Sequence, residues 1–159
     1  MRHTHSLSLA LFPVLLLMGC QVQPKQPSSA AQKRLNEVAF LLDVDSIDAI
    51  RVVHSPPAEH PIRITLDTLV SAGGSYVLQL QRTPVELHSQ ELAEALRSAD
   101  ALNSTWSGEV NWAVVLYNVD RKEMVRIGLD ESGRNGYVGA DAVRLNSGLV
   151  EWARSMLPR

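Results

Sequence analysis

The feature that most constrains the fold is a series of short stretches with β-strand patterning. Residues 112–119 (WAVVLYNV) are mostly apolar and rich in aromatic and β-branched side chains, which is typical of a central strand buried on both faces. Residues 62–67, 76–81 and 125–129 alternate apolar and polar side chains, which is typical of strands with one buried face. Residues 47–54 (IDAIRVVH) also predict a strand. These stretches together predict a sheet.

Helical patterning separates the predicted strands. Within residues 35–42, apolar side chains recur at i, i+3, i+4 and i+7, which predicts a short amphipathic helix. Ser89 precedes an apolar periodicity in residues 90–99, and Ser147 precedes another in residues 148–157. Serine is a favoured N-cap, so we expect a helix to start after each. The sequence therefore predicts an α+β fold, with an antiparallel sheet and helices packed on one face.

Two parts of the chain resemble each other. Residues 62–67 (IRITLD) parallel residues 125–130 (VRIGLD), and residues 85–89 (VELHS) parallel residues 143–147 (VRLNS). Each unit would contain a strand, a glycine-containing turn, a second strand and a capped helix. We therefore consider an internal pseudo-repeat, strand-strand-helix twice. The alternative is coincidence, because alternating strand patterns match one another easily.

The first nineteen residues have the pattern of a secretory signal. Arg2 supplies a positive charge, and an almost entirely apolar run extends from Leu7 to Met18. This run is shorter than the roughly 20 residues needed to cross a bilayer. A charged start, a short apolar core and a small residue before the cleavage point are typical of a signal peptide. The alternative is a buried N-terminal helix, which Pro13 and the polar residues after Cys20 disfavour.

Residues 17–20 (LMGC) resemble the lipobox of bacterial lipoproteins. The resemblance implies cleavage between Gly19 and Cys20 and attachment of lipid to Cys20, so the expected partner at this end of the chain is the membrane. In that family the residue after the cysteine helps sorting, and Gln21 favours the outer membrane, on the periplasmic side. Cys20 is the only cysteine in the chain, so the domain beyond it contains no disulfide.

The predicted organisation is a signal peptide (residues 1–19), a lipid-anchored tether (residues 20–34) and a single α+β domain (residues 35–159). The tether contains several proline, glutamine and serine residues and offers no apolar periodicity. Net charge is −2 for the whole chain, and removing Arg2 with the signal makes it −3. A chain so close to neutral, without clusters of basic residues, is not expected to bind nucleic acid.

No familiar catalytic or cofactor-binding motif occurs in the sequence: G-x-S-x-G and H-E-x-x-H are both absent. Two groups of residues could in principle supply metal ligands. The aspartates of residues 43–48 do not match a calcium loop, and the histidines offer no complete zinc set. We therefore expect no metal and no cofactor. The side chains that could have served as ligands are expected on the solvated surface: Asp43, Asp45, Asp48, His54, His60 and His88.

The function these features favour is that of a non-catalytic cell-envelope lipoprotein. It would face the periplasm and bind a protein or an envelope polymer. Trp106 in a polar loop is a candidate for the partner surface, since tryptophan is enriched in interface hot spots, whereas Trp112 is expected in the core. Two alternatives remain: an immunity or inhibitor protein acting on a toxin or lytic enzyme, and an envelope hydrolase with an unrecognised site.

Overall fold

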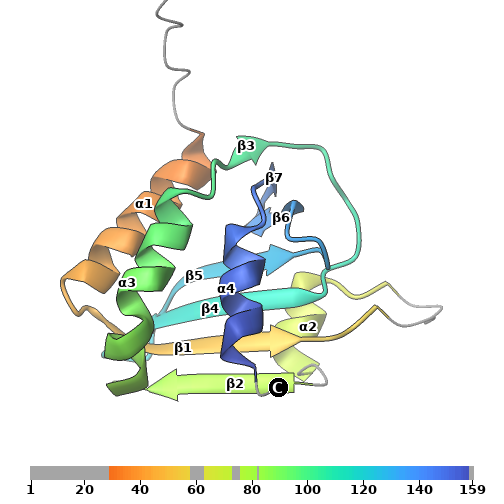
Figure 1. Ribbon diagram of the computed structural model, residues 1–159. Helices are drawn as coiled ribbons and strands as arrows, with labels where there is room; N and C mark the ends of the chain where they lie inside the picture. Colours follow the sequence, from red (N-terminus) through yellow and green to blue (C-terminus); the bar gives the residue numbers. More distant parts are fainter. Residues whose placement is uncertain (1–28, 58–62, 73–75, 82, 158–159) are drawn as a thin grey trace, which may run out of the picture.

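The structure is a computed structural model that describes residues 29–57, 63–72, 76–81 and 83–157. Four helices and seven strands occur in this part of the chain (Figure 1). The helices are α1 (Ala30–Asp43), α2 (Leu66–Ala72), α3 (Thr83–Arg97) and α4 (Gly148–Met156). The strands are β1 (Ile47–His54), β2 (Tyr76–Gln81), β3 (Leu102–Asn103), β4 (Trp112–Asn118), β5 (Glu123–Leu129), β6 (Asn135–Val138) and β7 (Asp141–Arg144).

All described strands belong to one sheet, in the order β2-β1-β4-β5-β6-β7-β3. Every neighbouring pair is antiparallel, which confirms the predicted α+β class with an antiparallel sheet. Strand β4 lies inside the sheet, and residues 112–116 are all buried, as their apolar character predicted. Gly136 lies where β6 approaches β5, and a Cβ atom there would come within 1.9 Å of the Gly128 carbonyl oxygen.

The main core lies between one face of the sheet and helices α1, α3 and α4, which Figure 1 shows side by side in front of the strands. Alternate residues of β1 and β4 point into it, among them Ile50, Val52, Val114 and Leu116. Trp112 is 1 % exposed and belongs to this core, as expected. Removing such apolar surface from water is the main favourable contribution to folding.

Helix α1 is fixed to the rest of the core by a buried glutamine. Ser29 caps the helix by accepting a hydrogen bond from the Gln32 backbone N–H at 3.0 Å. The Gln32 side chain donates to the Leu96 and Arg97 carbonyl oxygens at 3.3 and 3.2 Å, and it accepts from the Ala101 N–H at 2.7 Å. Gln32 thereby satisfies backbone groups at the end of α3 that have no partner within the helix.

The opposite face of the sheet is covered only in part. Helix α2 packs there and forms a second, smaller core, which contains Val53, Leu66, Leu69, Val70, Val110, Ala113 and Val115. Figure 1 shows α2 behind the sheet, at the end where β1 finishes and β4 begins. Three of the four described helices thus share one face, as predicted, and α2 lies on the other. We call this second face the α2 face.

Residues 62–67 do not form the predicted strand. Residue 62 lies outside the described part, residues 63–65 are irregular, and Leu66 begins α2. The Thr68 N–H donates to the Thr65 hydroxyl at 3.2 Å, so a side-chain cap starts a helix where the alternation indicated a strand. Residues 125–129 do lie in strand β5, so the two stretches differ in structure and the pseudo-repeat is not confirmed.

Two predicted helix boundaries also differ from the structure. Helix α3 begins at Thr83, so Ser89 lies inside the helix and is not its N-cap. Helix α1 begins at Ala30, so the last five residues assigned to the tether belong to this helix. Ser147 does occupy the N-cap position of α4, although its hydroxyl donates to Glu151 at 2.6 Å and makes no capping bond.

Candidate functional site

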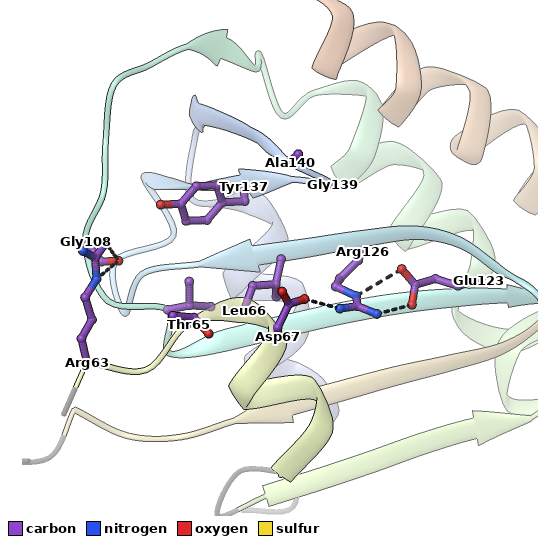
Figure 2. A pocket seen from close by; sticks show the side chains of 11 residues that line it. Arg63, Thr65, Leu66, Asp67, Gly108, Glu123, Arg126, Tyr137, Gly139 and Ala140 are labelled. Atoms are coloured by element: carbon purple, nitrogen blue, oxygen red, sulfur yellow. Dashed lines mark hydrogen bonds and ion pairs between the residues drawn. The ribbon is translucent and has the colours of Figure 1, made fainter.

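The α2 face contains a groove of about 430 Å³, which we call the α2 groove (Figure 2). It runs between the start of α2, the loop before β4 and the turn between β6 and β7. Its volume is within the range typical of ligand-binding pockets. The lining residues are Arg63, Thr65, Leu66, Asp67, Gly108, Val110, Glu123, Arg126, Tyr137, Gly139 and Ala140.

One end of the α2 groove carries a three-membered charged cluster. Arg126 donates to both Glu123 oxygens, at 3.1 and 2.7 Å, and to Asp67 at 2.6 Å (Figure 2). The pKa of the Arg126 guanidinium is raised, mainly by the hydrogen bonds with Glu123, so this group stays charged. Two carboxylates around one guanidinium give this end of the groove a local charge of −1.

The other end of the α2 groove is formed by Arg63 and the loop before β4. Arg63 donates to the Gly108 carbonyl oxygen through Nε and Nη2, at 3.2 and 2.7 Å. The Trp106 ring lies 2.5 Å from the position of a Cβ atom on Gly108, so only glycine fits against this ring. The Tyr137 hydroxyl donates to the Trp106 carbonyl oxygen at 3.4 Å, and the two rings lie 5.3 Å apart.

Between its charged ends, the α2 groove has an apolar floor. Leu66 and Val110 are both buried in the second core. Gly128 lies beneath them on β5, where a Cβ atom would be 2.9 Å from the Leu66 side chain. The groove therefore offers an apolar surface between a positive end at Arg63 and a net negative end at the Arg126 cluster, which suits an extended ligand.

A second cluster, on the opposite face, joins β1, β4 and α4. Glu131 accepts from His54 Nε2 at 3.1 Å and from the Trp112 indole at 3.2 Å, through the same oxygen. Its other oxygen accepts from Arg154 at 3.0 Å. His54 stacks on Trp112 with ring centroids 3.7 Å apart, as expected for directly paired residues of β1 and β4.

A histidine beside a carboxylate is also the arrangement of a catalytic acid–base pair. Here, however, the Glu131 carboxylate is already bonded to three donors, and the His54 side chain is only 12 % exposed. We therefore assign this cluster to stability, as a link between the sheet and α4.

Of the predicted site residues, the structure describes Trp106 but not Gly19 or Cys20. Gly19 and Cys20 lie outside the described residues, so the lipid site remains a prediction. Trp106 is half-buried against the second core and supports Gly108 and Tyr137 at the rim of the α2 groove. Within the described ranges, no three His, Cys, Asp or Glu side chains come together as a metal site; His60 falls outside those ranges.

Several residues of the α2 groove were not predicted from the sequence. Arg63 and Arg126 lie in the two stretches, residues 62–67 and 125–129, whose alternation predicts strands but indicates no shared site. A sequence signal for α2 was nonetheless present. Thr65 is a suitable N-cap, Asp67 follows in the first turn, and Leu66, Leu69 and Val70 have helical spacing.

Comparisons with known proteins give no relative from which a role could be transferred. No protein family, curated protein or solved structure matches the chain. Among the described residues, no helix has the length and apolar character needed to cross a membrane. The functional interpretation therefore depends on the geometry of the chain itself.

Proposed function

We propose that the protein is a non-catalytic binding module of the cell envelope, held at the outer membrane by lipid on Cys20 and facing the periplasm. The observation that carries the binding role is the α2 groove, with its apolar floor and opposite charges at its two ends. Hydrophobic contact supplies affinity in such a groove, whereas the fixed charges at its ends set the orientation of the ligand.

The partner that best fits the α2 groove is an extended protein segment. An acidic group of that segment would lie near Arg63, and a basic group would lie near Asp67 and Glu123. Each charged side chain of the groove is already held by a neighbour, so little side-chain entropy is lost when a partner binds. An inhibitor or immunity role would use the same groove against a toxin or lytic enzyme.

The experiment that tests this role places a photo-crosslinking amino acid at Ala140, an exposed residue of the groove rim. The matched control places it at Ala30, an exposed alanine at the start of α1. In intact cells, we expect Ala140 to give a discrete protein adduct that mass spectrometry identifies, and we expect no such adduct at Ala30. The adduct should weaken when Arg63→Ser is added.

Equal adducts at Ala140 and Ala30, or an adduct unaffected by Arg63→Ser, would contradict the proposal. Arg63 is exposed and its bond to Gly108 is on the surface, so the Arg63→Ser variant should keep its fold. Circular dichroism of the variant checks this directly.

A further inference from the structure

A second depression lies on the α2 face, at the end of the sheet that α2 leaves uncovered. Its volume is about 210 Å³, and its lining residues are Asp48, Ala49, Arg51, Gln79, Tyr117 and Arg121. The strand register explains how they meet: Arg51 pairs with Gln79 on β2, and Ala49 pairs with Tyr117 on β4. Three neighbouring strands and the β4–β5 turn therefore contribute polar side chains to one place.

The two arginines in this depression differ from four other arginines in the described part of the chain. Arg34, Arg97, Arg126 and Arg154 each form an ion pair with a carboxylate. Within the described part of the chain, the side chain of neither Arg51 nor Arg121 has a hydrogen-bonded or ionic partner, and Arg51 is half-buried. A guanidinium that lines a depression without a partner is free to form charge-assisted hydrogen bonds with an anionic ligand.

The backbone of Arg121 gives an independent indication. Its φ is +59°, in the left-handed region that glycine and asparagine adopt most readily. Its N–H donates to the Asn118 carbonyl oxygen at 2.9 Å, which closes the β4–β5 turn. Since glycine would form this turn with less strain, the turn alone does not account for an arginine. A role of the Arg121 guanidinium at the edge of the depression would account for an arginine at this position.

We propose that this depression binds a phosphate group. Arg51 and Arg121 supply the charge, because guanidinium forks match phosphate oxygens in geometry. The Tyr117 hydroxyl and the Gln79 amide add donors from the neighbouring strands. A tetrahedral phosphate can accept hydrogen bonds from all these directions, whereas a carboxylate offers its lone pairs only in one plane.

Charge and size are consistent with this ligand. Two arginines and Asp48 give the depression a net charge of +1, which complements a phosphodiester. Its volume is about seven times the ~30 Å³ that one water molecule occupies in the liquid, so it holds a phosphate with part of its substituent. The phosphate could belong to a soluble phosphodiester or to a phospholipid headgroup, and the experiment separates these sources.

The test follows the arginine Nε–H signals of the full chain by NMR, in a detergent with an uncharged headgroup. Inorganic phosphate is titrated at constant ionic strength, with acetate as the comparison. We expect the Arg51 and Arg121 signals to shift and saturate with phosphate, and to respond less to acetate. Arg51→Gln and Arg121→Gln should each weaken binding by at least about tenfold.

Arg144→Gln is the matched control, because Arg144 is an exposed arginine outside this depression with no ion pair among the described residues. It should change phosphate affinity by less than about twofold. Arg121 is exposed, so its variant tests the site even if the Arg51 variant is less stable. Shifts that do not saturate, or an equal loss of affinity with Arg144→Gln, would overturn the proposal.

The source of the phosphate is determined with two further probes. Glycerol phosphate represents a soluble ligand, and vesicles of phosphatidylglycerol represent a headgroup, the latter tested by flotation of the Cys20→Ser chain. Binding of either probe that Arg121→Gln weakens supports the site and identifies its source. If both probes bind and neither Arg51→Gln nor Arg121→Gln weakens their binding, the proposed phosphate site is excluded. This site is separate from the α2 groove, so its failure leaves the proposed binding function intact.

Discussion

Glu131 illustrates how one surface carboxylate can organise several elements. It bonds to His54 on β1, to the indole N–H of Trp112 on β4 and to Arg154 on α4. Trp112 is 1 % exposed, and its indole N–H donates to the Glu131 carboxylate. A buried donor left without a partner lowers the stability of the fold. Glu131 should therefore contribute more to the free energy of unfolding than most partly exposed carboxylates do.

We therefore predict that Glu131→Ala lowers the free energy of unfolding by about 1–3 kcal/mol. The control is Glu94→Ala, because Glu94 is an exposed glutamate on α3 and its loss should cost less than about 0.5 kcal/mol. Urea melts of both variants measure the difference. Equal stability of the two variants would show that the His54–Trp112–Arg154 cluster does not depend on this carboxylate.

Asp130 holds the β5–β6 turn with its side chain. It accepts from Ser132, from Asn135 and from the Arg134 backbone N–H at 2.8, 2.8 and 3.1 Å. Burial alone would raise the pKa of Asp130, but these hydrogen bonds outweigh it and the pKa is lowered below the usual 3.8. The folded chain therefore binds this proton less readily than the unfolded chain does.

This shift gives a stability that depends on pH. The contribution of Asp130 is complete above its unfolded pKa and is lost as the pH falls through its lower, folded pKa. We predict that Asp130→Asn is less stable than wild type at pH 7, and that the gap narrows below about pH 4. Asp120→Asn, in the exposed β4–β5 turn, is the control and should show no such narrowing. Thermal melts between pH 3 and 7 decide this.

At the residue scale, the sequence allowed some roles to be predicted and not others. The burial of Trp112 followed from its apolar neighbours in the stretch predicted as a central strand. The role of Asp130 was missed, although an aspartate followed by Ser132 and Gly133 is a common turn pattern. The Glu131 cluster depends on β1, β4 and α4 meeting in space, and no local pattern contains that information.

At the scale of elements, periodicity predicted the four strands β2, β1, β4 and β5, which are consecutive neighbours in the sheet. Strands β1 and β2 have the predicted ranges, and β4 and β5 agree within two residues. Helix α2 was missed because Ile62, Ile64 and Leu66 alternate as in a strand. The start of α3 lies six residues before Ser89, at Thr83, where the following Pro84 suits the first turn of a helix.

The difference between α2 and β5 leads to a quantitative prediction. Ile127 is fully buried in the main core, whereas Ile64 is only half-buried beside the second core. We predict that Ile127→Ala lowers the free energy of unfolding by about 2–5 kcal/mol, the usual range for a buried aliphatic side chain. Ile64→Ala should cost only about 1 kcal/mol. Denaturant melts that gave equal losses would instead support equivalent positions and a true repeat.

At the scale of the whole molecule, both proposed sites lie on the face that three of the four described helices leave free. The α2 groove combines Arg63, Gly108, Arg126 and Tyr137, which come from four separate segments. Their meeting depends on the strand order of the sheet, which no pattern in the sequence specifies. The phosphate site likewise depends on the register between β1, β2 and β4. The sequence therefore predicted the class of fold but neither site.

The proposed membrane anchor and the first described residue are close in sequence. Eight residues separate Cys20 from Ser29, the N-cap of α1, and the nine residue-to-residue steps between them span at most about 30 Å. A lipid on Cys20 would thus keep the domain within about 30 Å of the bilayer surface. A single acyl chain binds a membrane only marginally, whereas several chains anchor a protein stably. Because the lipid would be attached through the thiol of Cys20, we expect membrane binding to depend on that thiol.

We predict that Cys20→Ser moves the protein out of the processed, membrane-bound fraction, leaving either uncleaved precursor or soluble chain. The measurement is cell fractionation followed by detection of the protein and of its apparent mass. Ser28→Ala, in the same segment, is the matched control and should stay with the membrane in processed form. A Cys20→Ser chain that is cleaved and still sediments with the membrane would mean that something other than a lipid on this residue holds the protein there.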